Sequence, residues 1–93
     1  MKAIWNGTVF AESDQTLMVG GNHYFPPESI KEQFFKSSES HTFCLWRGPA
    51  SYYDVVVEGK VSEAGAWYYP APFPMARKVR GYVAFWRGVI VQA

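Results

Sequence analysis

The sequence predicts a mainly β fold of two small antiparallel sheets, with one short helix after Pro27. Short runs of alternating apolar and polar residues recur along the 93-residue chain, as expected of strands with one buried face. Turn residues separate these runs at intervals of about 8–12 residues, a spacing typical of a β-sandwich or open barrel. A pair of matched stretches is the third observation, and it indicates an internal duplication.

The matched stretches are residues 41–48, HTFCLWRG, and residues 81–88, GYVAFWRG. In both, an apolar pair lies on one face of a strand, and a small residue followed by a tryptophan lies on the other. Two aromatic residues and a proline precede each stretch. We therefore interpret the chain as a single domain, residues 1–93. Its related halves, roughly 1–43 and 44–93, are expected to pack as pseudo-symmetric sheets.

The first half is predicted to hold two hairpins and the helix. Asn6-Gly7 is a strong hairpin signal because both residues tolerate a positive φ. Pro26 ends the last of these strands because proline cannot donate to a strand ladder. Pro27 then suits the first turn of a helix that should extend to about Phe35. The strands expected in this half are residues 2–5, 8–11, 16–19 and 23–25.

The second half is predicted to contain strands and an extended arm. Residues 51–57 alternate most clearly, with Tyr53 on one face and Tyr52 and Asp54 on the other. Prolines at positions 70, 72 and 74 should form an arm that cannot pair fully, because they lack the N–H group. The expected strands are residues 42–46, 51–57, 60–61, 66–69, 82–86 and 89–92, with a helical turn over 75–79.

Composition and charge argue against several classes of function. The net charge is +1 and the charged residues are scattered, so no nucleic-acid partner is expected. No apolar run approaches the about 20 residues of a membrane span, so no membrane association is expected. The single cysteine excludes an internal disulfide and favours the reducing cytoplasm. One Cys and two His are too few for a structural zinc site, and we predict neither metal nor cofactor.

Cys44 is the first candidate for catalysis. A nucleophilic thiol needs a base or a cation nearby. His41 and Arg47 are each three residues from Cys44, which would place them on the opposite face of a strand. An activating group would therefore come from elsewhere, such as His23. A small buried residue that matches Ala84 is the favoured interpretation of Cys44.

Asp54 is the second candidate for catalysis, because it interrupts a strongly apolar strand. We expect its carboxylate to be either exposed or paired with an arginine such as Arg47 or Arg87. A structural pairing is favoured over a catalytic or ligand-orienting role.

A group of polar-tipped aromatic residues with one arginine forms the candidate ligand site. Tyrosine and tryptophan combine an apolar body with one polar group, which suits a binding pocket. The arginine fork binds anions. The aromatic-proline elements and the Trp-Arg-Gly ends could converge on one cleft, although core packing explains the group equally well. The predicted ligand-binding residues are Tyr24, Trp46, Arg47, Tyr53 and Tyr69, and Trp67 belongs to the same group.

Several motifs together resemble a known family. They are NHYFP (residues 22–26), CLWRGPASYY (44–53), AWYYPAP (66–72) and GYVAF (81–85), and they extend over nearly the whole chain. They resemble the small bacterial family labelled domain of unknown function 427, whose usual motif has proline and lysine where this chain has Leu45 and Arg47. The resemblance implies a single, mainly β domain similar to the Mss4-like or β-tent architecture.

The same family has also been labelled nucleotidyltransferase-like. The paired aspartates that would hold two metal ions, and a glycine loop that would cradle phosphates, are both missing from this sequence. Our leading hypothesis is instead a domain that binds a small anionic ligand in an aromatic and arginine-lined cleft. An enzyme that uses Cys44 or Asp54 is the first alternative. A protein-interaction module, recognisable by a large exposed apolar patch, is the second.

Overall fold

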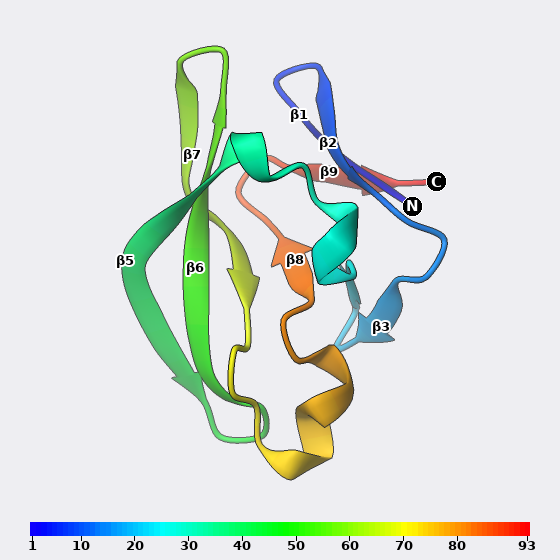
Figure 1. The fold of residues 1–93 in the computed structure, drawn as a ribbon, viewed down its shortest axis with the longest axis vertical. Helices are drawn as coiled ribbons and strands as arrows, with labels where there is room; N and C mark the ends of the chain where they lie inside the picture. The colour runs from blue at the N-terminus through cyan, green and yellow to red at the C-terminus, as the bar shows by residue number, and fades with distance from the viewer.

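The computed structural model describes all 93 residues and confirms a mainly β chain without a long helix (Figure 1). None of its helical turns is long and apolar enough to cross a membrane. The elements are β1 (Lys2–Trp5), β2 (Thr8–Glu12), β3 (Leu17–Val19), β4 (Asn22–Tyr24), the 3-10 turns η1 (Pro27–Ser29) and η2 (Glu32–Phe34), β5 (Phe35–Cys44), β6 (Gly48–Val57), β7 (Lys60–Tyr68), the 3-10 turn η3 (Pro74–Val79), β8 (Val83–Phe85) and β9 (Ile90–Gln92).

The strands form three antiparallel sheets, in the orders β2-β1-β9, β3-β4 and β5-β6-β7-β8. The β1–β2 hairpin turns at Asn6-Gly7 as predicted, and both residues have a positive φ. β1 lies between β2 and β9, which brings the two chain ends side by side (Figure 1). The prediction of small antiparallel sheets is confirmed, but there are three of them where two were expected.

The sheets do not follow the predicted division into halves. β1 and β2 come from the first half, and the second edge of β1 pairs with β9 from the second half. The largest sheet takes β5 almost entirely from the first half and β6, β7 and β8 from the second. The two matched stretches therefore end up at the two sides of one sheet, as the end of β5 and as β8.

The core consists of two buried clusters on opposite faces of the four-stranded sheet. The larger cluster includes Phe10 of β2, whose ring centroid lies 5.2 Å from that of Phe85. The smaller cluster includes Tyr24 of the β3–β4 hairpin. Val83 and Phe85 belong to the first cluster and Ala84 to the second, which is the division of faces that the alternation predicted.

A helical element begins at Pro27 as predicted, but it ends after a single turn. Ile30 is extended, with φ −88° and ψ 145°, and forms a β-bridge with Ala11 of β2. The next residue donates its N–H to a carbonyl of the same strand at 2.8 Å. These contacts with β2 interrupt the helix, so the predicted continuation to Phe35 is wrong. A separate turn, η2, follows, and Phe35 begins β5.

The β5–β6 connection forms one end of the molecule (Figure 1). β5 ends at Cys44, two residues earlier than predicted, and residues 45–47 form a tight turn. Gly48 then opens β6 with a φ of +100°. The proline arm crosses this turn, where the Phe73 N–H donates to the Arg47 carbonyl at 2.9 Å. A Cβ at Gly48 would lie only 3.3 Å from the Phe73 nitrogen, so glycine permits the close crossing.

Candidate functional site

A cleft of about 180 Å³ lies where the β3–β4 hairpin meets the four-stranded sheet. It is on the face that carries the smaller core cluster. Five aromatic rings, one side-chain amide and one guanidinium line it, and no carboxylate does. The lining residues are Asn22, Tyr24, Arg47, Tyr52, Trp67, Tyr69 and Trp86.

The aromatic walls of the cleft are held by contacts with one another. Tyr52 of β6 and Trp67 of β7 are cross-strand neighbours. The Trp67 ring meets Tyr24 edge-on at 6.2 Å and Trp86 at 5.6 Å, and its Nε1–H donates to the Tyr24 hydroxyl oxygen at 3.2 Å. The Trp86 Nε1–H donates to the Ala64 carbonyl at 2.6 Å. These contacts fix the ring orientations before any ligand arrives.

Arg47 supplies the only charge in the cleft. Its guanidinium lies against the β3–β4 turn, where a Cβ at Gly20 would come within 2.7 Å of Nη2. Its Nη1 lies 4.0 Å from the Cys44 sulfur. Burial opposes the charge, yet the pKa of Arg47 is raised because Tyr24, Tyr69 and Cys44 all favour the cation. The side chain is therefore held in place with its charge not neutralised by a carboxylate.

Cys44 lies next to the cleft and has an unexpected partner. The expectation that Arg47 would point away from it is wrong, because β5 ends at Cys44 and the turn folds Arg47 back over the sulfur. The backbone N–H groups of Trp46 and Arg47 lower the pKa of the Cys44 thiol; burial opposes this shift, and the Arg47 charge adds to it. His23 instead hydrogen-bonds the Thr16 hydroxyl at 3.0 Å.

Tyr69 adds a protonated hydroxyl beside the guanidinium. Burial raises the pKa of Tyr69, Tyr24 adds to the shift, and Arg47 opposes it. A phenol with a raised pKa stays protonated at neutral pH and can donate a hydrogen bond. Arg47 and Tyr69 together offer donors to an anion from one side of the cleft.

Residues 1–92 match the family described as domain of unknown function (DUF427). The chain belongs to this family. Comparison with curated proteins gives no match. The DUF427 assignment confirms the resemblance carried by the sequence motifs, while the Mss4-like or β-tent architecture stays a prediction.

Three of the five ligand-binding residues predicted for this DUF427 domain share the cleft, namely Tyr24, Arg47 and Tyr69. They come from β4, from the β5–β6 turn and from the residue after β7. Trp46 does not join them: it is 70% exposed and lines a second hollow that meets the cleft at Arg47. The tight turn separates the two neighbours, because it carries Arg47 inward and leaves Trp46 outside.

Tyr53 lies on the wrong face of the sheet for the cleft. Its ring stacks on that of Tyr68 at 4.6 Å and packs against the larger core cluster. Its neighbour Tyr52 faces the cleft instead; strand alternation separates the two tyrosines but does not show which face is core. Trp86 continues the face that carries Ala84, so its position depends on the same choice of face. No feature of the sequence marked Asn22 as a cleft residue, because asparagine after two glycines is typical of a turn.

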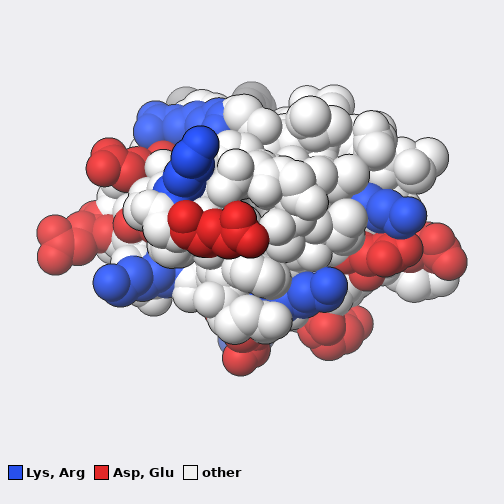
Figure 2. All heavy atoms as spheres, turned by 90° about the horizontal axis from the view of Figure 1, so that it is seen from above, with Lys and Arg blue, Asp and Glu red and all other residues white.

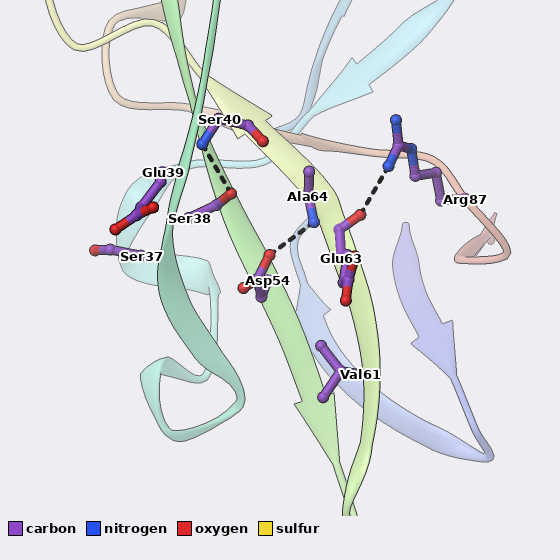
Figure 3. Close-up of a pocket in the computed structure, with 9 residues that line it drawn as sticks. All are labelled: Ser37, Ser38, Glu39, Ser40, Asp54, Val61, Glu63, Ala64 and Arg87. Carbon is purple, nitrogen blue, oxygen red and sulfur yellow. Dashed lines mark hydrogen bonds between the residues drawn. The ribbon is translucent and has the colours of Figure 1, made fainter.

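Asp54 belongs to the largest hollow of this DUF427 domain, of about 560 Å³ (Figure 3). The pairing of β6 with β7 shifts register here, and the Asp54 carboxylate accepts the Ala64 N–H at 2.8 Å. Its partner is therefore backbone and not an arginine. Arg87 donates to the Glu63 carbonyl at 3.1 Å. The polar side chains spread along the hollow without converging on one point (Figure 3). No three His, Cys, Asp or Glu residues of the protein gather as metal ligands would.

Proposed function

We propose that the cleft binds a small anionic ligand, with Arg47 holding the anionic group. The observation that carries this proposal is an arginine without a carboxylate partner in a cleft walled by five aromatic rings. A guanidinium presents paired N–H donors that match the oxygens of a carboxylate or phosphate. The partial burial of Arg47 strengthens such a contact relative to one made in bulk water.

The walls of the cleft favour a ligand with a flat apolar part. The Trp67 and Trp86 rings lie edge-on to each other at 5.6 Å and both line the cleft, so they offer apolar aromatic surface to a planar group. The Tyr24 hydroxyl accepts a hydrogen bond from Trp67, so its own proton remains free to reach an oxygen. An aromatic or unsaturated acid would combine these contacts with the contact to Arg47.

The size of the cleft sets a limit on the ligand. Pockets for drug-sized molecules usually measure about 300–1,000 Å³, whereas this cleft measures about 180 Å³. A single ring with one acidic group fits this space, and a larger ligand would extend beyond it. We therefore expect a monocyclic acid or a terminal group of that kind.

The test compares benzoate and phenyl phosphate with their neutral counterparts, benzamide and benzyl alcohol. Tryptophan fluorescence reports binding because Trp67 and Trp86 line the cleft. We expect the anions to bind at least about tenfold more tightly than the neutral probes, a difference of about 1.4 kcal/mol. Arg47→Gln should abolish this difference. Arg77→Gln, in the exposed part of η3, should preserve it.

Two outcomes contradict the proposal. One is equal affinity for charged and neutral probes in the wild-type protein. The other is an anion preference that survives Arg47→Gln with the fold intact by circular dichroism. Arg47→Lys separates charge from geometry: it keeps the charge that the family motif usually carries but loses the planar fork, so binding should weaken without disappearing.

The second candidate function is catalysis or redox chemistry at Cys44, in a reducing compartment such as the cytoplasm. One observation favours it: turn amides and Arg47 surround a thiol that is only partly buried. A lowered pKa increases the thiolate fraction, which is the nucleophilic form. Asp54 carries no such proposal, because the only hydrogen bond of its carboxylate is with a backbone N–H and no catalytic partner lies beside it.

The rate of alkylation by iodoacetamide tests the Cys44 candidate. The rate follows the thiolate, so a lowered pKa moves the inflection of its pH profile below the about 8.5 of a free thiol. Arg47→Gln should move the inflection only part of the way back, because the backbone N–H groups contribute most. The urea-unfolded chain is the control and should show the free-thiol value. A folded-state inflection at or above that value would exclude an activated thiol.

A further inference from the structure

The end of the molecule formed by the β5–β6 turn and the proline arm is unusually apolar. Nine large hydrophobic side chains of the protein are exposed, and five of them gather here. Their exposed fractions range from 37% at Phe73 to 80% at Leu45. We call this surface the apolar end, and its members are Phe43, Leu45, Trp46, Phe73 and Met75.

The five side chains form one contiguous surface. The rings of Phe43 and Phe73 meet edge-on at 5.8 Å. Trp46 and Met75 line the same hollow, and Leu45 precedes Trp46 in the turn. A backbone hydrogen bond of 2.9 Å from Phe73 to the turn ties the two segments together, and they lie side by side in Figure 1. Contiguous exposed apolar patches often mark interaction sites.

The apolar end contains a hollow that can accept a side chain of a partner. The hollow measures about 260 Å³, and aliphatic, aromatic and thioether groups supply most of its lining. Arg47 and Lys78 stand among these apolar groups. One leucine or phenylalanine side chain could insert there while flanking groups reach the two cations. The remaining lining residues are Val19, Trp46, Met75, Ala76 and Val79.

Charge is distributed unevenly around this end. None of the eight acidic residues of the chain falls within residues 40–53 or 64–93. The exposed residues of the η3 segment include Arg77, Lys78 and Arg80. The opposite end, in the view of Figure 2, shows Asp and Glu interspersed with Lys and Arg. A partner at the apolar end therefore meets positive charge from η3 and Arg80, and the turn, the proline arm and η3 contribute no carboxylate of their own.

We propose that the apolar end docks an acidic segment of a partner protein, which inserts one apolar side chain into the hollow between Trp46 and Met75. Tryptophan, phenylalanine, methionine and arginine are the residue types that protein interfaces favour. A second copy joined symmetrically through the same surface would bring Lys78 and Arg77 against their own counterparts, which is unfavourable. An anionic lipid surface would complement the positive charge but would insert no specific side chain into the hollow.

The test selects short peptides from a random library displayed on phage, using the immobilised full chain. We expect enriched peptides to combine Asp or Glu with one or two large apolar residues. Met75→Ser and Lys78→Glu should each lower the affinity for a synthetic copy of the best peptide by at least about tenfold. Both side chains are exposed, so neither change should alter the unfolding temperature appreciably.

Matched controls separate this surface from the rest of the protein. Ile90→Ser removes an exposed apolar side chain on β9, and Lys60→Glu reverses an exposed charge beside the β6–β7 turn. Both should leave peptide binding unchanged. Met75→Ser should also retain benzoate binding, so failure here is distinguishable from failure of the anion cleft.

Three results overturn the proposal. The first is a selection that yields no sequence-specific peptide, and the second is one that yields basic or uncharged peptides. The third is acidic peptides whose affinity is unaffected by Met75→Ser and Lys78→Glu. Sedimentation with phosphatidylserine vesicles accompanies the selection. Vesicle binding that depends on Met75 and Lys78, without peptide enrichment, would assign the apolar end to a lipid surface instead.

Discussion

Replacing Gly48 with alanine is expected to destabilise the protein by about 2–4 kcal/mol. Gly48 has a φ of +100°, a conformation whose strain costs an L residue about 1–3 kcal/mol. The new methyl group would also lie 3.3 Å from the Phe73 nitrogen and 3.5 Å from the Ala71 carbonyl oxygen. If the arm moves away to relieve this contact, the hydrogen bond from the Phe73 N–H to the Arg47 carbonyl is lost. Losing this bond costs about 0.5–1.5 kcal/mol of stability.

Gly59 provides the matched control, because it shares the backbone requirement without the close contact. Its φ is +78°, and a Cβ there would meet no atom within 4 Å. Left-handed backbone costs an L residue about 1–2 kcal/mol, and alanine regains about 0.4–1 kcal/mol by restricting the unfolded chain. We therefore expect Gly59→Ala to destabilise by about 1 kcal/mol or less.

Thermal unfolding followed by circular dichroism distinguishes the two variants. In a domain of about this size, each kcal/mol lowers the unfolding temperature by about 4–8 °C. Gly48→Ala should lower it by about 8–32 °C, and Gly59→Ala by about 8 °C or less. Equal shifts would refute the reasoning, because they would mean that the crossing of the proline arm over the turn contributes nothing to stability.

Two further predictions concern the core and the cleft. In urea denaturation, Phe10→Ala should lower the free energy of unfolding by about 3–5 kcal/mol, because the side chain is fully buried. Phe43 is 61% exposed, so Phe43→Ala should lower it by about 0.5 kcal/mol or less. Similar losses for the two variants would contradict the assignment of core and surface. Trp67→Phe and Tyr24→Phe should be coupled by about 0.5–1.5 kcal/mol in a double-mutant cycle, because each removes the same 3.2 Å hydrogen bond; additive effects would show that this bond is not formed.

The fold class could be predicted because local patterns determine most of it. The Asn6-Gly7 turn and the alternation of Val83, Ala84 and Phe85 each depend on residues close in sequence, and each appears in the structure as expected. The sheet partners of β1 could not be predicted in this way. Pairing with β9 joins residues about ninety positions apart, and nothing in either strand specifies the other.

The candidate site was predictable only where a residue type coincides with a local turn. Tyr24, Arg47 and Tyr69 each stand at the end of a strand and reach the cleft. Tyr52 and Tyr53 are adjacent tyrosines on opposite faces, so choosing between them requires knowing which face is core. The contact between Cys44 and Arg47 depends on where β5 ends, and a difference of two residues reverses the expected geometry.

The two Trp-Arg-Gly sequences show most directly why residue identity alone does not define the cleft. In the first, Arg47 turns inward to the cleft and Trp46 is left 70% exposed. In the second, Trp86 lines the cleft while 42% exposed; its Nε1–H donates to the Ala64 carbonyl of β7, and Arg87 lies over its ring at 4.6 Å.

Backbone conformation makes the difference between these two sequences. The glycines of both triplets have a positive φ, +100° at Gly48 and +91° at Gly88, but in the second triplet Arg87 has one as well, +51°. A positive φ is uncommon for a non-glycine residue and marks a tight turn of the backbone. The cleft therefore receives one residue from each triplet, a cation from one and an aromatic ring from the other. Because the two triplets contribute different residue types, the same cleft has both the positive charge of Arg47 and the aromatic ring of Trp86.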